Sequence, residues 1–309
     1  MDVQVQRGFR RRMGVYLGEM YPPGSRLGAA ALLYLGFTAM LDRVHGLPFS
    51  PLSAWTAIGT WDVFSLLLIL RLMDELKDRE VDRRLFFDRP LPSGRVREGD
   101  IIFSLGLMNT LYLAANLPAG RAFWTAAGVL AYAWLMFRHF FIPGLLRRCL
   151  LLNLATHNPF IPLLLLHLVV LFAVQADLPL RAVRWERALL LVAMFWPMSF
   201  AWEISRKIRA REEENDYVTY SKILSRPGAV ALAAGAQTLT FALAVHFFRS
   251  LSLSGVFIGV AAAGYALALW GHVRFLLKPS PRTSRLKPFA QIYIVSVLAA
   301  VLAEALLSG

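Results

Sequence analysis

Long apolar runs without charged residues are the feature that most limits how this sequence can fold. Uncharged stretches of roughly 20 residues recur along the chain, and about 20 such residues are what an α-helix needs to cross a bilayer. Of the 309 residues, 57% are hydrophobic and 17% are charged, whereas a globular protein carries about 25% charged residues. The single cysteine, Cys149, cannot form an internal disulfide. These features exclude a soluble enzyme, a disordered protein and a disulfide-stabilised secreted domain.

The uncharged stretches number nine, and each is predicted to be a membrane-spanning helix. A backbone in lipid must satisfy its hydrogen bonds within its own segment, which favours helices. The stretches cover residues 27–41, 52–70, 101–118, 122–137, 150–174, 188–202, 228–248, 252–273 and 289–307. We therefore expect an all-α membrane protein with a basic cytoplasmic or interfacial arm, residues 1–25, and a single membrane domain, residues 26–309.

The basic residues predict how the chain is oriented. If nine spans alternate, 27 of the 33 Lys and Arg residues fall on the side of the N-terminus. Positive residues accumulate in cytoplasmic loops, so this side is predicted to be cytoplasmic and the protein to lie in the cell (inner) membrane. The formal net charge of +13 then faces anionic lipid headgroups. It does not indicate nucleic-acid binding.

The arm before the first span has a helical pattern of its own. Its apolar residues recur at helical spacing, and basic residues occupy the remaining faces. These apolar residues are Phe9, Met13, Tyr16, Leu17 and Met20. The pattern is typical of a short helix lying in the membrane interface, and a disordered basic tail is the alternative.

A first group of acidic residues follows directly on the second span. Asp74, Asp78 and Asp82 are four residues apart and would lie along one face if the helix continued. Like charges at this spacing repel each other, and a bridging cation removes the repulsion. Mg²⁺ prefers carboxylate oxygens and is often shared with substrate phosphates. The group therefore predicts a Mg²⁺–diphosphate site with Arg71 and Lys77 beside it, or else a solvated helix neutralised by its own cations.

A second acidic group follows the sixth span. Glu203 lies at the end of an apolar helix, where an ionisable residue is costly and usually functional. Lys207 is one turn further on and could pair with Glu203 or reach a phosphate. The run from Glu212 to Glu214 is expected to be a solvated loop face.

The residues after the second span read Asp74-Glu-Leu-Lys-Asp78-Arg-Glu-Val-Asp82, followed by Arg89-Pro-Leu-Pro-Ser-Gly94. This segment closely resembles the first signature of the UbiA superfamily of intramembrane prenyltransferases. The family pattern is Asn-Asp-x-x-Asp-x-x-x-Asp, with a basic segment ending in Arg-Pro-x-Pro-Ser-Gly. Asp78 and Asp82 match directly, whereas Asp74 stands at the usual Asn and Glu75 at the usual Asp. The family has nine helices, with acidic motifs on the cytoplasmic side after the second and sixth.

Two other family motifs are altered in this sequence. A Tyr-x-x-x-Lys element that grips diphosphate in relatives is represented by Trp134-Leu-Met-Phe-Arg138, in which arginine keeps the cation and adds bidentate geometry. The second acidic motif, normally Asp-x-x-x-Asp, is Glu203-x-x-x-Lys207. A charged lysine cannot bind Mg²⁺, so either Glu203 alone holds a second metal or Lys207 acts as a fixed charge on the diphosphate.

The resemblance implies a bundle of nine transmembrane helices around a central cavity open to the cytoplasmic face. It implies Mg²⁺-dependent transfer of a prenyl group from an isoprenoid diphosphate to an acceptor that the sequence does not identify. The expected catalytic residues are Asp78 and Glu203, the metal ligands Asp74, Asp78, Asp82 and Glu203, and the diphosphate-binding residues Arg71, Lys77, Arg138 and Lys207. A membrane terpene cyclase on the same fold and a transporter or lipid-binding protein remain alternatives.

Overall fold

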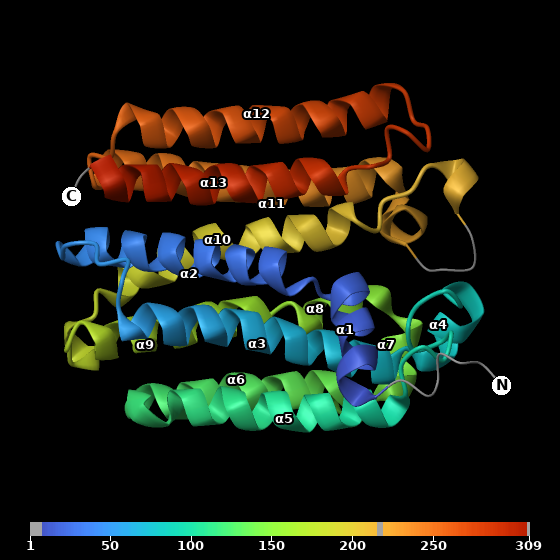
Figure 1. The fold of residues 1–309 in the computed structure, drawn as a ribbon. Helices are drawn as coiled ribbons and strands as arrows, with labels where there is room; N and C mark the ends of the chain where they lie inside the picture. Colours follow the sequence, from blue (N-terminus) through green and yellow to red (C-terminus); the bar gives the residue numbers. More distant parts are fainter. Residues whose placement is uncertain (1–7, 215–218, 308–309) are drawn as a thin grey trace. The chain divides into compact units, whose positions relative to one another are not determined.

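The computed structural model describes residues 8–214 and 219–307, and the regular structure of these two ranges is entirely helical (Figure 1). The α-helices are α1 Phe9–Met20, α2 Pro23–His45, α3 Ala54–Lys77, α4 Arg79–Leu85, α5 Glu98–Asn116, α6 Arg121–Phe137, α7 Pro143–Arg148, α8 Leu150–His157, α9 Phe160–Gln175, α10 Trp185–Ser205, α11 Tyr220–Ser250, α12 Gly255–Leu277 and α13 Lys287–Leu307.

The described ranges contain eight helices that are long and apolar enough to cross a membrane. They are α2, α3, α5 with its short continuation to Ala119, α8 and α9 together, and α10 to α13. These helices coincide with eight of the nine predicted spans. The remaining span, 122–137, is also a helix, α6, but its 17 residues are at the lower end of the length required for a crossing. The count of nine transmembrane helices therefore stays a prediction.

The N-terminal arm contains the helix that its pattern predicts. From Phe9 to Met20 the chain forms α1, with Arg12, Met13 and Tyr16 buried. The alternative of a disordered tail is therefore wrong for this segment, whereas residues 1–7 of the arm lie outside the described residues.

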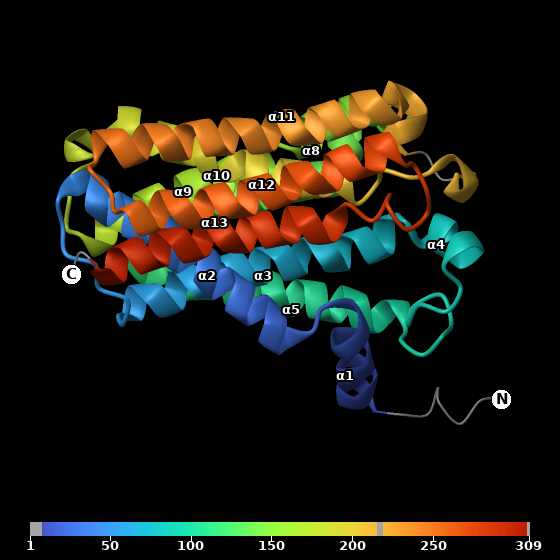
Figure 2. The ribbon, with the colours of Figure 1, turned by 90° about the horizontal axis from the view of Figure 1, so that it is seen from above.

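The chain forms two compact units. The first contains residues 1–34, 52–149 and 174–176, and the second contains residues 35–51, 150–173 and 177–309. In the first unit α3 packs against α5 and α6, and α5 lies beside α6 (Figure 1). In the second unit α10, α11, α12 and α13 pack in sequence, and α13 also packs against α10. Figure 2 shows α11, α12 and α13 side by side in this group.

Small residues allow the helices within each unit to approach closely. A Cβ atom on Gly271 of α12 would lie 2.7 Å from the Phe289 ring of α13, and one on Gly59 of α3 would overlap the Tyr34 ring of α2. Close backbone approach at small residues is typical of helices packed in membranes. The contact at Gly59 involves α3, the helix that carries the start of the first acidic segment.

Candidate functional site

The first acidic segment is carried by the end of α3 and by α4. The spacing of the aspartates predicted that the helix continues through this segment, but α3 ends at Lys77. Asp78 adopts φ −98° and ψ 8° before α4 begins. The path nevertheless stays close to helical, because the Asp78 N–H donates to the Asp74 carbonyl and the Asp82 N–H donates to the Asp78 carbonyl, both at 2.9 Å.

The three aspartates of this segment differ in their surroundings. Asp74 and Asp78 are exposed, whereas Asp82 is 5% exposed. The Arg89 guanidinium donates to the Asp82 carboxylate at 2.8 Å and stacks on the Phe86 ring, 3.9 Å from its centroid. The arginine of the second half of the signature thus folds back onto the last aspartate of the first half.

A tight turn follows Arg89 directly. The Val96 N–H donates to the Pro90 carbonyl at 3.0 Å, and the Ser93 hydroxyl donates to the Arg89 carbonyl at 2.7 Å. Gly94 has φ +75°, a conformation that glycine adopts without strain. The Pro-x-Pro-Ser-Gly residues therefore form a turn whose hydrogen bonds hold the backbone carbonyl of Arg89, the residue that pairs with Asp82.

Glu75 belongs to this site, although the sequence analysis did not assign it. Its side chain is fully buried and pairs with Arg71 one turn earlier. Its Oε2 atom makes no hydrogen bond within the described residues, and its charge interacts with those of Asp82 and Asp74. The equal spacing of the three aspartates favoured Asp74. The signal for Glu75 was the family pattern, which has an acidic residue at that position.

The predicted diphosphate-binding cations of the first unit belong to the ends of α3 and α6. Arg71 is held by Glu75. Lys77, at the end of α3, lies 3.4 Å (Nζ to O) from the Met136 carbonyl in the last turn of α6. Arg138 follows α6 directly and is exposed. The structure therefore places the end of α6, with Arg138, beside the end of α3.

The donor atoms of this segment fit Mg²⁺ in kind. Carboxylate oxygens are the ligands that Mg²⁺ prefers, and a buried acceptor without a partner, such as Glu75 Oε2, is an exception in native structures that calls for an explanation. Arg71 and Arg89 already provide one counter-charge each to Glu75 and Asp82. Across the described ranges, no three His, Cys, Asp or Glu side chains form a group that could hold a metal ion.

The second acidic segment belongs to the second unit. Glu203 lies in the last turn of α10, where its carboxylate accepts from the Arg206 guanidinium and from the Lys207 ammonium, the latter at 3.1 Å. The Lys207 ammonium also lies 5.7 Å from the centroid of the Tyr220 ring. Glu203 is therefore matched by two cations in its own segment.

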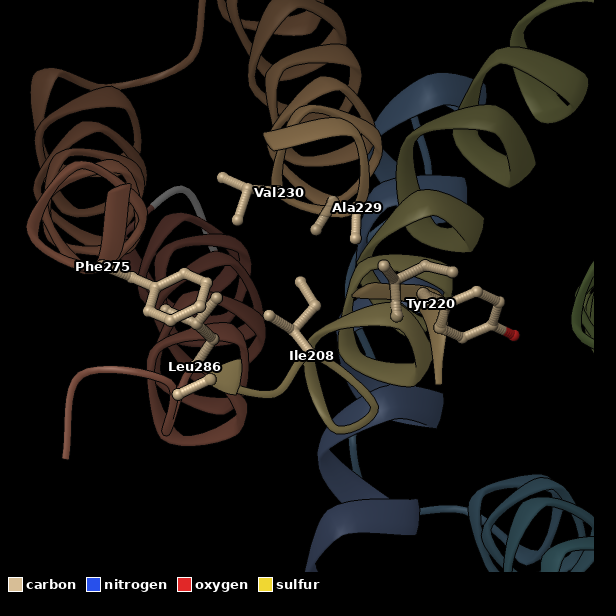
Figure 3. Close-up of a cluster of buried hydrophobic side chains, with 9 residues drawn as sticks. Ile208, Tyr220, Ala229, Val230, Phe275 and Leu286 are labelled. Atoms are coloured by element: carbon tan, nitrogen blue, oxygen red, sulfur yellow. The ribbon is translucent and has the colours of Figure 1, made fainter. Parts of the chain in front are cut away.

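A buried apolar cluster fixes the backbone around Glu203 and Lys207. Ile204 and Ile208 are fully buried among residues of α11, α12 and the loop before α13 (Figure 3). The other members of the cluster are Ala210, Tyr220, Ala229, Val230, Ala233, Phe275 and Leu286. Since the isoleucines face this cluster, Glu203 and Lys207 keep partly exposed side chains.

The acidic run after α10 is less solvated than expected. Glu212 is exposed, but Glu213 and Glu214 are half-buried. Glu213 accepts from the Ser284 hydroxyl at 2.5 Å, and Glu214 accepts from the Ser221 hydroxyl at 2.7 Å. The expectation of a solvated face is therefore wrong for these two carboxylates, because they satisfy donors of the loops that surround them. Residues 215–218 lie outside the described residues.

Two solved structures are similar to this chain over nearly its whole length. One, described as digeranylgeranylglyceryl phosphate synthase in membranes, is 15% identical, with a TM-score of 0.65 over 96% of this chain and 99% of the other. The second, the apo structure of a UbiA homolog from Aeropyrum pernix K1, is 17% identical, with a TM-score of 0.63 over 90% and 97%. The chain has the UbiA fold.

This fold confirms the resemblance that residues 74–95 indicated. Neither the protein-family models nor the curated proteins give a match, so the likeness rests on structure and on the signature. Together with the eight apolar helices, the UbiA fold identifies the chain as a multi-pass membrane protein.

Proposed function

We propose that this protein is a membrane prenyltransferase that uses an isoprenoid diphosphate as donor and depends on Mg²⁺. The observation that carries the proposal is the first acidic segment, where buried Glu75 and Asp82 lie with Arg71 and Arg89 at the end of an apolar helix. Carboxylates suit a divalent cation, and arginines suit phosphate oxygens. The UbiA fold and the signature over residues 74–95 support the same reaction.

Each charged residue then has a defined role. Asp74, Asp78 and Asp82 would hold Mg²⁺ in the first unit, together with Glu75, and Glu203 would do so in the second. Arg71, Lys77, Arg138 and Lys207 would bind the diphosphate. When bound, Mg²⁺ supplies a positive charge that stabilises the diphosphate as it leaves.

The remaining steps depend on the chain itself. The arginines and lysines stabilise negative charge on the leaving group, since preformed charges aimed at a developing charge lower the barrier. The apolar helices bind the prenyl chain and keep water from the carbocation-like allylic carbon. Asp78 and Glu203, as the catalytic carboxylates, keep the donor oriented so that the acceptor attacks that carbon.

We further propose that the protein lies in the inner membrane, with its N-terminus and both acidic segments on the cytoplasmic side. The support is the distribution of charge, with 27 of 33 basic residues on one side if nine spans alternate. Labelling of single cysteines introduced into the stretches 71–97 and 177–187, with a reagent that does not cross the membrane, tests this orientation. Equal labelling of both stretches from one side would contradict it.

The function is tested by incubating the purified protein with a radiolabelled isoprenoid diphosphate and a membrane lipid extract as the source of acceptor. Release of diphosphate with a labelled lipid adduct supports the transferase. Release with a cyclic hydrocarbon indicates the terpene cyclase, and no release indicates a transporter or lipid-binding protein. Chelation should abolish release and added Mg²⁺ should restore it; turnover that resists the chelator would contradict the metal assignment.

A further inference from the structure

Helix α1 is fixed to the first unit by ion pairs near both of its ends. The Arg12 guanidinium donates to both carboxylate oxygens of Asp100, at 2.6 and 2.7 Å, and both side chains are buried. Near the other end, Glu19 pairs with Arg95, the residue that follows the signature turn. A basic helix that only rested on the lipid surface would not need a buried ion pair such as Arg12–Asp100. Helix α1 is therefore an integral part of the unit that contains the first acidic segment.

Between these two anchors α1 inserts Tyr16 beside the first acidic segment. Tyr16 is 0% exposed, and its phenol lies next to Arg71 and Glu75. Its hydroxyl and Glu75 Oε2 are both buried and make no hydrogen bond of ordinary geometry in the described part of the chain. Burial, and next to it the charge of Glu75, raise the pKa of the Tyr16 phenol, so that the hydroxyl keeps its proton.

Two buried polar atoms close to one arginine and without ordinary hydrogen bonds are unusual, because buried polar groups are nearly always satisfied. The Tyr16 hydroxyl is enclosed by protein, and the groups beside it are side chains of the first acidic segment. It can act on the Arg71–Glu75 pair, which is the part of the segment that the proposed function assigns to diphosphate and metal. Groups that orient metal ligands from behind commonly tune metal affinity.

We propose that α1 is a component of the active site and that Tyr16 is a positioning residue, whose hydroxyl sets the orientation of Arg71 and, through it, of Glu75. This inference rests on the proposed function. It assigns a role to the N-terminal arm, which lies outside the signature residues. It also accounts for the two ion pairs that anchor α1, one of them buried, since a positioning residue must itself be held in place.

The test removes the Tyr16 hydroxyl alone and follows Mg²⁺ binding without turnover. For the purified full-length protein, the thermal unfolding midpoint is measured against Mg²⁺ concentration with inorganic pyrophosphate present. Tyr16→Phe should raise the Mg²⁺ concentration that gives half of the stabilisation by about tenfold. The Mg²⁺ dependence of diphosphate release should shift in parallel.

Tyr112→Phe is the matched control. Tyr112 is also fully buried in the first unit, but its hydroxyl donates to the Ala126 carbonyl at 3.1 Å, so its loss should leave the Mg²⁺ dependence unchanged. An unchanged Mg²⁺ dependence in Tyr16→Phe would overturn the inference, and so would an equal shift in both variants. If the wild-type protein is not stabilised by Mg²⁺ and pyrophosphate, the proposed function fails first. If Mg²⁺ and pyrophosphate stabilise the wild type but Tyr16→Phe has the same Mg²⁺ dependence, only the role of α1 is overturned.

Discussion

Replacing Glu75 by glutamine should separate activity from stability. The Glu75 side chain is fully buried and Arg71, its partner, is about one quarter exposed. Glutamine has nearly the same shape and still offers Arg71 an oxygen acceptor. The substitution therefore removes the negative charge of the residue without creating a cavity.

The magnitudes follow from these surroundings. A hydrogen bond to a charged group contributes about 1.5–3 kcal/mol and a neutral one about 0.5–1.5 kcal/mol, so the pair loses about 1 kcal/mol. The substitution also removes the cost of burying a carboxylate, and Arg71 keeps some contact with water. The free energy of unfolding should therefore change by less than about 2 kcal/mol. The loss of one charge from the metal site should lower diphosphate release by about 100-fold, equivalent to ~2.7 kcal/mol.

The assay compares diphosphate release with thermal unfolding in detergent for the wild type, Glu75→Gln and Glu98→Gln. Glu98 is the control, because it is an exposed carboxylate of the same unit that pairs with Arg79. It should lose neither activity nor stability. Release by Glu75→Gln above about a tenth of the wild-type rate would refute the role of the Glu75 charge. Unfolding at a much lower temperature with normal release would show that Glu75 serves the fold only.

Three further results are expected. Asp78→Ala should abolish diphosphate release and leave the unfolding midpoint close to that of the wild type, because Asp78 is exposed; retention of most activity would contradict its catalytic role. Lys207→Ala should lower release by about ten- to a hundredfold if the ammonium binds diphosphate, and raised Mg²⁺ should rescue Lys207→Asp but not Lys207→Ala. A loss below about threefold would mean that Lys207 only neutralises Glu203, 3.1 Å away. Gly59→Ala should lower the free energy of unfolding by about 1–3 kcal/mol, and with it the unfolding midpoint, because the added Cβ would overlap the Tyr34 ring. Gly106→Ala, in open space, should leave both unchanged.

The apolar spans were predictable because lipid allows so few solutions. A stretch of about 20 uncharged residues has to satisfy its backbone within itself, so length and charge alone located eight of the described helices. The helical spacing of Phe9, Met13 and Tyr16 likewise identified α1. The sequence did not reveal that Arg12 pairs with Asp100, because 88 positions separate the two residues and no local pattern connects them.

The candidate site was predictable only as far as local spacing determines it. Counting aspartates at intervals of four selected Asp74, which the structure leaves exposed, and passed over Glu75, which it buries. The difference depends on which face of α3 meets α1, and packing determines that face. The pairing of Arg89 with Asp82, seven positions earlier, likewise depends on how the chain bends after α4 ends at Leu85. Spacing indicated the type of chemistry, whereas tertiary contacts select the residues that are buried.

The balance of charge differs between the two acidic segments and supports a different role for each. In the first, Glu75 and Asp82 have one arginine each, whereas Asp74 and Asp78 are exposed carboxylates with basic residues beside them in the sequence. In the second, the single carboxylate of Glu203 accepts from two cations. Several carboxylates in one segment suit a metal cation, whereas two cations on one carboxylate leave positive charge for a phosphate anion. Lysine at position 207, where the family pattern has a second aspartate, therefore favours contact with diphosphate as the role of Lys207, beside the proposed metal role of Glu203.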